Sequence, residues 1–212
     1  MQNLISTQVK KFVVTGFKGG IGKSVSSLHI AAVLQLRSSV VVIDGDPNES
    51  LIDWTSKGNL SIPVIRASEA KQKLKTLAPD YAVLDTAARP DLEELQALAR
   101  QSDLLILPCT PDALSLRALT KTVKTLQALG SDKYRILLTR VPPGRKVGEQ
   151  AAELLRSHGL PVFKTHIREY AAYEYAALSG QLVKDARDAN GRKDRNGAIA
   201  FSDYLAMGHE LP

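Results

Sequence analysis

Residues 11–27 read KFVVTGFKGGIGKSVSS, and this stretch decides the fold. Its apolar, β-branched beginning predicts a buried strand, and residues 24–37, with apolar side chains at helical spacing, predict a helix. A glycine-rich loop between a strand and a helix is the setting of a phosphate-binding loop. The stretch nevertheless departs from the standard G-x-x-x-x-G-K-[ST] pattern. Phe17 stands where that pattern has its first glycine, and a second lysine, Lys18, precedes the glycines.

The residue types of this loop suit the phosphates of a nucleotide. Glycines take backbone angles that other residues avoid, so successive N–H groups can point inward at phosphate. Lys23 supplies a positive charge for the β- and γ-phosphates, and Ser24 offers a hydroxyl to Mg²⁺. The N-terminus of the following helix adds a partial positive charge. We therefore assign nucleotide binding to Gly19, Gly20, Ile21, Gly22, Lys23, Ser24 and Val25.

Carboxylates that suit a metal follow two other apolar runs. Asp44 and Asp46 come after VVVI, and Asp85 comes after YAVL. The carboxyl ends of parallel strands meet at one edge of a sheet, beside a loop of this kind. Asp85 fits the Walker B arrangement best, an aspartate after four apolar residues. A turn or helix-capping role stays open for each, and more so for Asp44 and Asp46, because GDP is also an ordinary turn signal.

Apolar strands alternate with amphipathic helices along the whole chain. The strands are uniformly apolar, as expected where both faces of a sheet are covered. This pattern predicts one α/β domain over 1–212, a doubly wound, mostly parallel β-sheet of about six to eight strands flanked by helices. We expect strands at 11–17, 40–44, 63–67, 80–87, 103–111, 134–141 and 161–167. We expect helices at 24–37, 68–78, 90–101, 114–129 and 147–159, a turn at 45–50, and helical structure after 167 with a surface loop at 185–197.

Composition narrows the class of protein. The 212 residues are 44% hydrophobic and 24% charged, which is ordinary for a soluble globular domain. No apolar run reaches the ~18 residues of a membrane span, and the polar N-terminus does not read as a secretory signal. One cysteine, Cys109, excludes an internal disulfide and a zinc or iron–sulfur cage from one chain, and it fits a reducing cytoplasm.

The net charge of +6 is carried by the second half of the chain. Residues 1–112 hold 12 Lys and Arg against 12 Asp and Glu, whereas residues 113–212 hold 16 against 10. A basic half favours a polyanionic partner such as nucleic acid. A well-solvated surface without a partner explains the same imbalance, and charge alone does not separate the two.

Together these motifs resemble the ParA/MinD family of P-loop ATPases with a deviant Walker A loop. The resemblance is carried by KGGIGKS at 18–24, VVVIDGDP at 40–47 and YAVLDTAA at 81–88. LLILPCTPDALSLRAL at 104–119 and ILLTRV at 136–141 extend it over nearly the whole chain. The combination of KGG-x-GK[ST] with D-x-D-P is specific to this family.

The resemblance implies ATP and Mg²⁺ as cofactors and gives catalytic roles to Lys18 and Asp46. Lys18 would reach across a dimer interface to the phosphates in the other subunit, and Asp46 would orient the attacking water. Asp44 and Asp85 would hold Mg²⁺ through waters, together with Ser24. The segment 140–143 would lie near the adenine, through Arg140 and Pro142. A plain strand-to-helix loop stays open for that segment.

Within this family, the chain resembles the short ParA type, which partitions or positions a cargo. The expected activity is slow ATP hydrolysis, stimulated by DNA and by a cargo-bound adaptor of ParB type, in an ATP-dependent homodimer. We expect no membrane binding, because residues 199–212 carry no cationic helix face, and a cytoplasmic, nucleoid-associated location. Candidate contacts to non-specific DNA are Arg168, Lys184, Arg187, Arg192, Lys193 and Arg195, with Arg145 and Lys146 as further ones.

Two other classes stay open. One is a MinD-like, membrane-associated positioning ATPase, and the other is a metabolic P-loop ligase that activates a carboxylate with ATP. The nature of the cargo, whether plasmid, chromosome region or protein organelle, does not follow from this sequence.

Overall fold

The computed structural model of the chain describes residues 9–58 and 60–212. Its centre is a six-stranded sheet in the order β3-β2-β4-β1-β5-β6, and every neighbouring pair is parallel. The expected doubly wound sheet is therefore confirmed, at the lower end of the expected strand number. The strands are β1 (Lys10–Gly16), β2 (Val40–Gly45), β3 (Val64–Arg66), β4 (Tyr81–Ala88), β5 (Leu104–Cys109) and β6 (Tyr134–Leu138).

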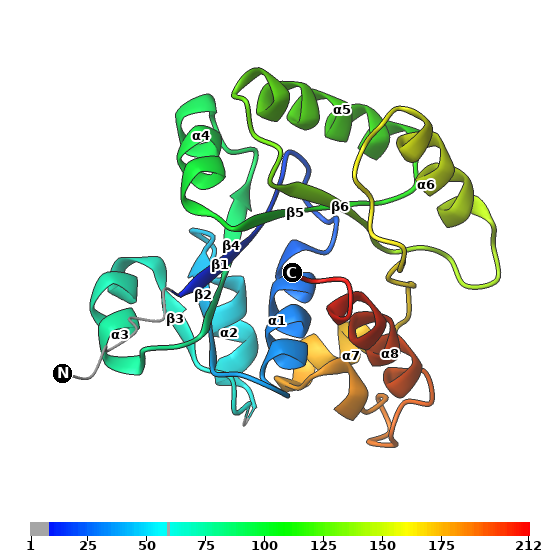
Figure 1. The fold of residues 1–212 in the computed structure, drawn as a ribbon. Helices are drawn as coiled ribbons and strands as arrows, with labels where there is room; N and C mark the ends of the chain where they lie inside the picture. Colours follow the sequence, from blue (N-terminus) through cyan, green and yellow to red (C-terminus); the bar gives the residue numbers. More distant parts are fainter. Residues whose placement is uncertain (1–8, 59) are drawn as a thin grey trace.

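Helices cover both faces of this sheet (Figure 1). One face carries α1 (Lys23–Leu34), α2 (Ser50–Ser56), α7 (Ala172–Ser179) and α8 (Gly197–Gly208). The other carries α3 (Ala70–Leu77), α4 (Leu92–Gln101), α5 (Ala113–Ala128) and α6 (Val147–Ser157). Short 3-10 turns, η1 (Ala67–Glu69) and η2 (Val183–Asp185), precede α3 and follow α7.

The two cores follow from the side-chain alternation of the strands. In β1, Phe12 and Val14 belong to the apolar cluster under α1 and α8, whereas Val13 belongs to the cluster under α4, α5 and α6. Successive side chains of a strand point to opposite faces, so a strand covered on both sides must be apolar at every position. β1 thus anchors both layers, and it places the loop that follows it at the centre of the sheet edge.

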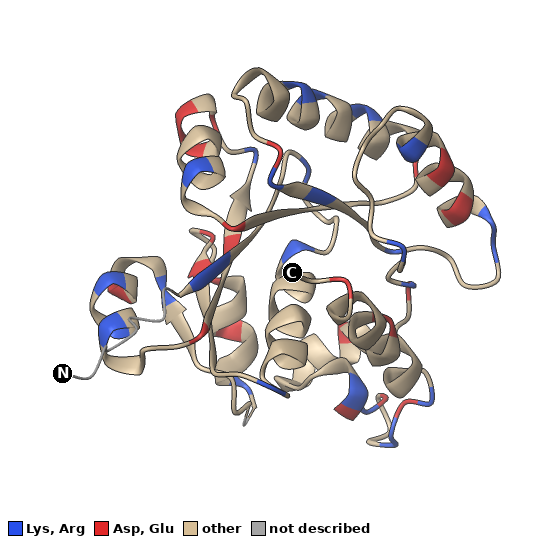
Figure 2. Cartoon of the chain, viewed as in Figure 1, with Lys and Arg blue, Asp and Glu red and all other residues tan. Residues whose placement is uncertain are grey.

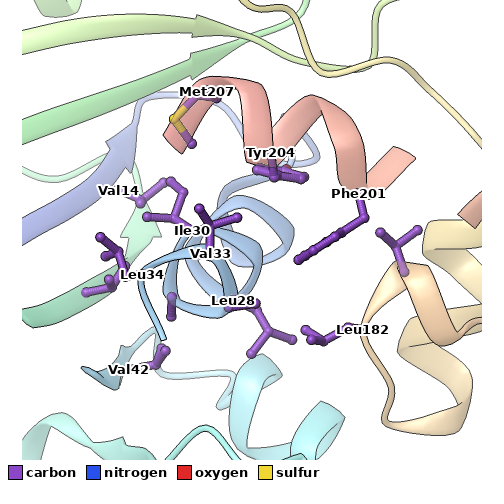
Figure 3. Close-up of a cluster of buried hydrophobic side chains, with 14 of the residues drawn as sticks. Val14, Leu28, Ile30, Val33, Leu34, Val42, Leu182, Phe201, Tyr204 and Met207 are labelled. Atoms are coloured by element: carbon purple, nitrogen blue, oxygen red, sulfur yellow. The ribbon is translucent and has the colours of Figure 1, made fainter. Parts of the chain in front are cut away.

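The C-terminal helix α8 packs directly on α1. Figure 3 shows Tyr204 and Met207 of α8 beside Ile30 and Val33 of α1 in one buried cluster. Ser26 of α1 and Tyr204 are also joined by a hydrogen bond of 3.1 Å between their hydroxyl groups. Helix α1, which begins at the phosphate loop, is therefore stabilised by its packing against α8.

A buried histidine joins α1 to the segment between α7 and α8. His29 is fully buried, its Nδ1 lies 2.7 Å from Val25 O, and its Nε2 accepts a hydrogen bond of 3.0 Å from Val183 N–H. Because Nε2 accepts, the proton of the neutral ring is on Nδ1 and is donated to Val25 O. Burial lowers the pKa of His29 to about 4, partly offset by the bond to Val25. Nearby, Trp54 of α2 donates from Nε1 to Gln181 O at 3.1 Å.

The expected strand at 161–167 is wrong. This segment runs beside β6 and makes backbone hydrogen bonds to it at both ends, from Phe163 N–H to Ile136 O at 2.9 Å and from Ile167 N–H to Leu138 O at 2.8 Å, but the ladder is interrupted and leaves only isolated bridges at Val162 and Arg168. Between them, the N–H groups of Lys164 and Thr165 donate to the Glu210 carboxylate, at 2.7 and 2.9 Å. A carboxylate from the end of the chain thus takes the donors that a sheet ladder would need.

The expected turn at 45–50 leads into a helix, α2, that the sequence pattern did not indicate. Its N-terminus is capped by Asp44, whose Oδ2 accepts from the N–H groups of Leu51 and Ile52 at 2.9 and 3.0 Å. The loop expected at 185–197 is confirmed in its main part, because it lies between η2 and α8.

Candidate nucleotide-binding site

A cavity of about 870 Å³ opens at the sheet edge where β1, β2 and β4 end. Its lining comes from the phosphate loop (residues 18–24), from residues 46–50, from the end of β4 at Ala87 and Ala88, and from residues 167–171 before α7. The volume lies within the range of small-molecule sites. Such a site is expected at the carboxyl ends of the strands of an open parallel sheet, at the point where the strand order reverses. In this sheet that point lies beside β1.

Gly20 and Gly22 give the phosphate loop its shape. Their φ angles are 72° and 80°, in the left-handed region that residues with side chains disfavour. Gly22 is the N-cap of α1, and its carbonyl accepts a hydrogen bond of 2.9 Å from Ser26 N–H. The first N–H groups of α1 have no partner within the helix, so loop and helix end together offer donors to an anion.

Lys23 and Ser24, at the start of α1, both line the cavity. Lys23 is only 8% exposed, and within the described residues no carboxylate lies within ion-pair distance of it. A buried ammonium without a paired charge is costly, unless an anion enters beside it. The loop is thus arranged to receive negative charge.

Asp85 lies within β4, three residues before the strand ends, and is fully buried. Burial raises its pKa to about 6, against the opposing effects of the neighbouring hydroxyl groups of Ser24 and Ser27 and the charge of Lys23. Its Oδ1 accepts from Ser27 Oγ at 3.0 Å, whereas its Oδ2 is buried without a hydrogen-bond partner among the residues described. An unpartnered carboxylate oxygen close to Ser24 fits Mg²⁺ or one of its waters.

Asp44 pairs in register with Asp85 across β2 and β4, but its own oxygens are used by backbone groups. Oδ1 accepts from Asp46 N–H at 3.1 Å, and Oδ2 caps α2 as described above. The structure thus gives Asp44 a capping role, and its role at Mg²⁺ stays a prediction.

Asp46 lines the cavity within a tight turn. Its Oδ1 accepts from both the N–H and the Nδ2 of Asn48, at 2.9 and 2.8 Å. The neighbouring Glu49 has a φ of 49°, which is uncommon for a residue with a side chain. The hydrogen bonds from Asn48 therefore fix the Asp46 carboxylate at the cavity, in a turn whose last residue, Glu49, has a strained backbone.

Lys18 does not line this cavity and lies on the other side of the loop. Its Nζ donates to Ser115 Oγ at 2.7 Å and lies 3.6 Å from Asp112 Oδ1, at the start of α5. Partial burial disfavours the charge of Asp112, but hydrogen bonds from Thr110 and Ser115 and the charge of Lys18 outweigh it and hold its pKa well below the usual range. The Lys18 side chain remains 40% exposed.

Of the two predicted adenine contacts, Arg140 lines the main cavity and Pro142 does not. The Arg140 guanidinium donates to Gly20 O at 3.0 Å and pairs with Glu169 at 2.7 Å. Pro142 lines a second hollow of about 560 Å³ on the Lys18 side of the loop. Contact of either residue with adenine stays a prediction.

The sequence reasoning missed the cavity wall at 167–171. Ile167, Arg168, Glu169, Tyr170 and Ala171 line the cavity there, with Tyr173 behind them on α7. The available signal was their position directly after an apolar run, at the same carboxyl edge of the sheet as the phosphate loop.

The basic residues predicted for DNA fall into two groups. Arg168 is bound to Asp203 of α8 through Nε and Nη2, the latter at 2.6 Å, and Lys184 pairs with Asp185 at 2.6 Å. The others stand in exposed loops. Arg187, Arg192, Lys193 and Arg195 lie in the basic loop (residues 186–196), and Arg145 and Lys146 lie before α6.

Hydrogen bonds within the basic loop give it a defined shape. Asp188 Oδ1 accepts from the N–H groups of Asn190 and Arg192, both at 2.9 Å, and Asp188 N–H donates to Arg192 O at 2.7 Å. Gly191 turns the chain with a φ of 74°. The loop therefore presents its cations on a short, hydrogen-bonded turn (Figure 2).

Comparison with known proteins agrees with this geometry. Residues 12–183 match the family described as the CobQ/CobB/MinD/ParA nucleotide binding domain. The "Maintenance of carboxysome distribution protein A" of Gloeobacter kilaueensis is 32% identical over 213 residues, covering 97% of this chain and 95% of that protein. The protein of the same name from Halothiobacillus neapolitanus is 28% identical over 85% of this chain and 89% of its own length.

Solved structures share the fold at low sequence identity. MinD of Aquifex aeolicus superposes with a TM-score of 0.73 at 16% identity, covering 96% of this chain and 97% of that one. Apo McdA of Cyanothece gives a TM-score of 0.70 at 16% identity, covering 97% and 100%. The phosphate loop, the strand-end carboxylates and the family match agree, and the chain belongs to the CobQ/CobB/MinD/ParA nucleotide-binding family, whose ParA and MinD members are P-loop ATPases.

Proposed function

We propose that this protein is a positioning ATPase that dimerises over ATP, binds DNA without sequence preference and distributes a cargo through an adaptor protein. One observation carries the proposal. The chain is similar over most of its length to proteins named for the maintenance of carboxysome distribution, and its own phosphate loop carries two lysines, Lys18 and Lys23.

The residues of the cavity have separate tasks in this proposal. Lys23 and the N–H groups of the phosphate loop hold the β- and γ-phosphates, where no carboxylate of the described residues pairs with the lysine. Ser24 and the unpartnered oxygen of Asp85 hold Mg²⁺, which neutralises charge on the phosphate oxygens. Asp46, half-buried at the cavity, orients the attacking water, and hydrolysis without a stimulating partner is slow.

Dimerisation uses Lys18. In the single subunit this lysine is held by Ser115 and Asp112, yet it is partly exposed and lies on the face of the phosphate loop. Two nucleotides brought face to face concentrate negative charge, so a lysine supplied by the other subunit stabilises the dimer only when ATP is present.

The DNA surface is the basic loop. Its cations are exposed and its shape is fixed by Asp188, and contact with phosphates needs only positive charge within reach. Such a surface binds DNA of any sequence and places the protein on the nucleoid.

The names of the two relatives favour a protein organelle of the carboxysome kind as cargo, rather than a plasmid. An adaptor on that cargo, in the role that ParB-type proteins have on DNA, then stimulates hydrolysis. Within the described residues no helix is both long and apolar enough to cross a membrane.

The decisive experiment is binding of the purified protein to a random-sequence duplex without nucleotide, with ADP, and with ATP and Mg²⁺, across a salt series. We expect binding only with ATP, weakening steeply as salt rises. Absence of DNA binding at low salt with every nucleotide would overturn the DNA role. A parallel arm with anionic vesicles and ATP would then identify a membrane-associated ATPase, and ATP turnover without either surface would indicate a metabolic enzyme.

A further inference from the structure

The residues that follow β6 hold the phosphate loop by two consecutive carbonyl groups. Thr139, only 2% exposed, donates from Oγ1 to Ile21 O at 2.8 Å. Arg140 donates from Nη1 to Gly20 O at 3.0 Å. Thr139 is itself anchored to β5, because its N–H donates to Cys109 O at 2.9 Å. The sheet therefore fixes two neighbouring peptide groups of the loop.

Fixing these carbonyls also aims the N–H groups of the same peptides. In a trans peptide the C=O and the N–H point in opposite directions. Gly20 O points toward Arg140, so the N–H of Ile21 in the same peptide points away from it. Likewise Ile21 O points toward Thr139, so the N–H of Gly22 points away. The left-handed angles of Gly20 and Gly22 are those from which an anion-binding nest is built.

Arg140 has an unusual backbone for this task. Its φ is 51°, in the region that favours glycine, and a residue with a side chain is strained there. Glycine at this position would relieve that strain but would provide no guanidinium. The strained backbone therefore carries a side chain that bridges two parts of the cavity, of which the first is the phosphate loop at Gly20.

The second part is the cavity wall at 167–171. Arg140 pairs with Glu169 through Nε at 2.8 Å and Nη2 at 2.7 Å. Glu169 is held in place by its own N–H, which donates to Val141 O at 2.9 Å. Because one planar guanidinium makes both contacts, the wall and the phosphate loop are linked through a single side chain.

This link contributes little to folding. The Arg140 and Glu169 side chains are 54% and 45% exposed, and ion pairs at that exposure add little to stability. An effect of Arg140 on nucleotide binding is therefore separable from an effect on the fold.

We propose that Arg140 is a positioning residue for nucleotide phosphates: held by Glu169, its guanidinium fixes Gly20 O so that the N–H donors of the phosphate loop are set before the nucleotide arrives. The proposal rests on the proposed ATP binding and adds to it how the phosphate loop is pre-organised and linked to the cavity wall.

The test compares substitutions at Arg140 in the full chain. Arg140→Ala and Arg140→Gly both remove the guanidinium, but only glycine relieves the left-handed backbone. Arg140→Lys keeps the charge without the fork, and Glu169→Gln removes the partner's charge. Arg100→Ala is the matched control, since it removes the same charge at an exposed position in the last turn of α4, which lines neither the cavity nor the second hollow. For each variant, the dissociation constants of ADP and Mg-ATP and the unfolding midpoint of the nucleotide-free protein are measured.

We expect Arg140→Gly and Arg140→Ala to bind both nucleotides about tenfold more weakly, as one charge-assisted hydrogen bond warrants. Arg140→Lys and Glu169→Gln should give a smaller loss, and Arg100→Ala none. The unfolding midpoint of Arg140→Gly should equal or exceed that of the unmodified chain. In turnover assays the loss should fall on KM rather than on kcat.

Three results would overturn the proposal. Arg140→Gly could bind like the unmodified chain while Arg140→Ala is impaired, which would assign the effect to the backbone. Arg100→Ala could lose as much affinity as Arg140→Ala, which would attribute the loss to net charge alone. Affinity in every Arg140 variant could be unchanged. If the unmodified chain itself binds no ATP, the proposed function fails, and this outcome is distinct from all three.

Discussion

Lys18 would exchange its partners if the proposed dimer forms. In the subunit its charge is shared with Ser115 and Asp112 on α5. To reach a second subunit it must leave that carboxylate, so dimerisation exchanges one ion pair for contact with phosphates. The exchange is favourable only where the new negative charge exceeds that of one aspartate.

Replacing Lys18 tests this exchange. We expect Lys18→Ala to bind ATP through Lys23 but to dimerise at least about thirtyfold more weakly, because removing one partner of a buried charge pair costs ~2 kcal/mol or more. Sedimentation with ATP and Mg²⁺ measures the dimer. Lys57→Ala, at a similarly exposed lysine on the far end of α2, is the control and should dimerise normally. Normal ATP-dependent dimerisation of Lys18→Ala would contradict the role.

His29 gives the fold a dependence on pH. Its pKa is about 4 in the folded protein and 6.5 when unfolded, so the unfolded chain takes up a proton first as pH falls. This contribution to stability is complete above pH 6.5 and is lost between pH 6.5 and 4, by about 3 kcal/mol in total. Urea unfolding across this range measures it. His29→Gln should flatten the profile, whereas His158→Gln, at an exposed position, should leave it unchanged. An unaltered slope in His29→Gln would refute the assignment.

At the residue level the sequence predicts well where the chemistry is local. Gly20, Gly22, Lys23 and Ser24 act within one loop, and their spacing alone places them at the cavity. Asp44 shows the limit, because the N–H groups of α2 that occupy its oxygens belong to residues that no spacing rule connects with a metal.

Among the elements, α8 shows how the end of the chain supports the site. It contacts α1 at close range, and Gly208 lies against Val33, where a methyl group would overlap its Cγ1. A glycine in a helix is usually unfavourable, and here it permits the close approach.

Gly208→Ala should therefore lower the free energy of unfolding by about 1–3 kcal/mol through overpacking. Chemical denaturation measures the change, with Ser202→Ala on the exposed side of α8 as the control. The double variant Gly208→Ala, Val33→Ala should recover part of the loss, since the two side chains share one space. A stability of Gly208→Ala equal to that of the unmodified chain would show that the helices adjust freely.

The elements also show what sequence patterns could and could not reveal. The six strands of the sheet were predictable because each contains a short apolar run. The segment 161–167 begins with a similar run, yet the Glu210 carboxylate, more than forty residues later in the chain, accepts two of its N–H groups. α2 was hidden for a similar reason, because its cap comes from the side chain of a preceding strand.

For the whole molecule, charge is distributed over both sheet faces (Figure 2). α3 carries Lys71, Lys73 and Lys75 on one face, whereas the basic loop stands beside α8 on the other. Arg192, Lys193 and Arg195 of the basic loop carry the same positive charge as the three lysines of α3, but at a different position. Substituting one triple or the other therefore separates a specific DNA surface from a general effect of net charge.

We expect the triple variant Arg192→Ala, Lys193→Ala, Arg195→Ala to bind DNA more weakly with ATP. The slope of log K against log salt should fall by up to about 0.9 for each DNA phosphate that the variant no longer neutralises. The matched triple Lys71→Ala, Lys73→Ala, Lys75→Ala should keep both affinity and slope. Equal losses of DNA affinity in the two triple variants would show that net charge alone explains the binding. Unchanged DNA affinity in the first triple variant would show that the basic loop does not contact DNA.

The hydrogen bond from Trp54 to Gln181 O has a practical consequence. Trp54 is the chain's only tryptophan, and it stands on α2, directly after the cavity-lining residues 46–50. Its indole is buried and bonded across to the segment that follows α7. Any separation of these two parts would break that bond and let water reach the ring. The unmodified protein thus carries its own fluorescent reporter, which can follow nucleotide titrations in real time without an attached dye.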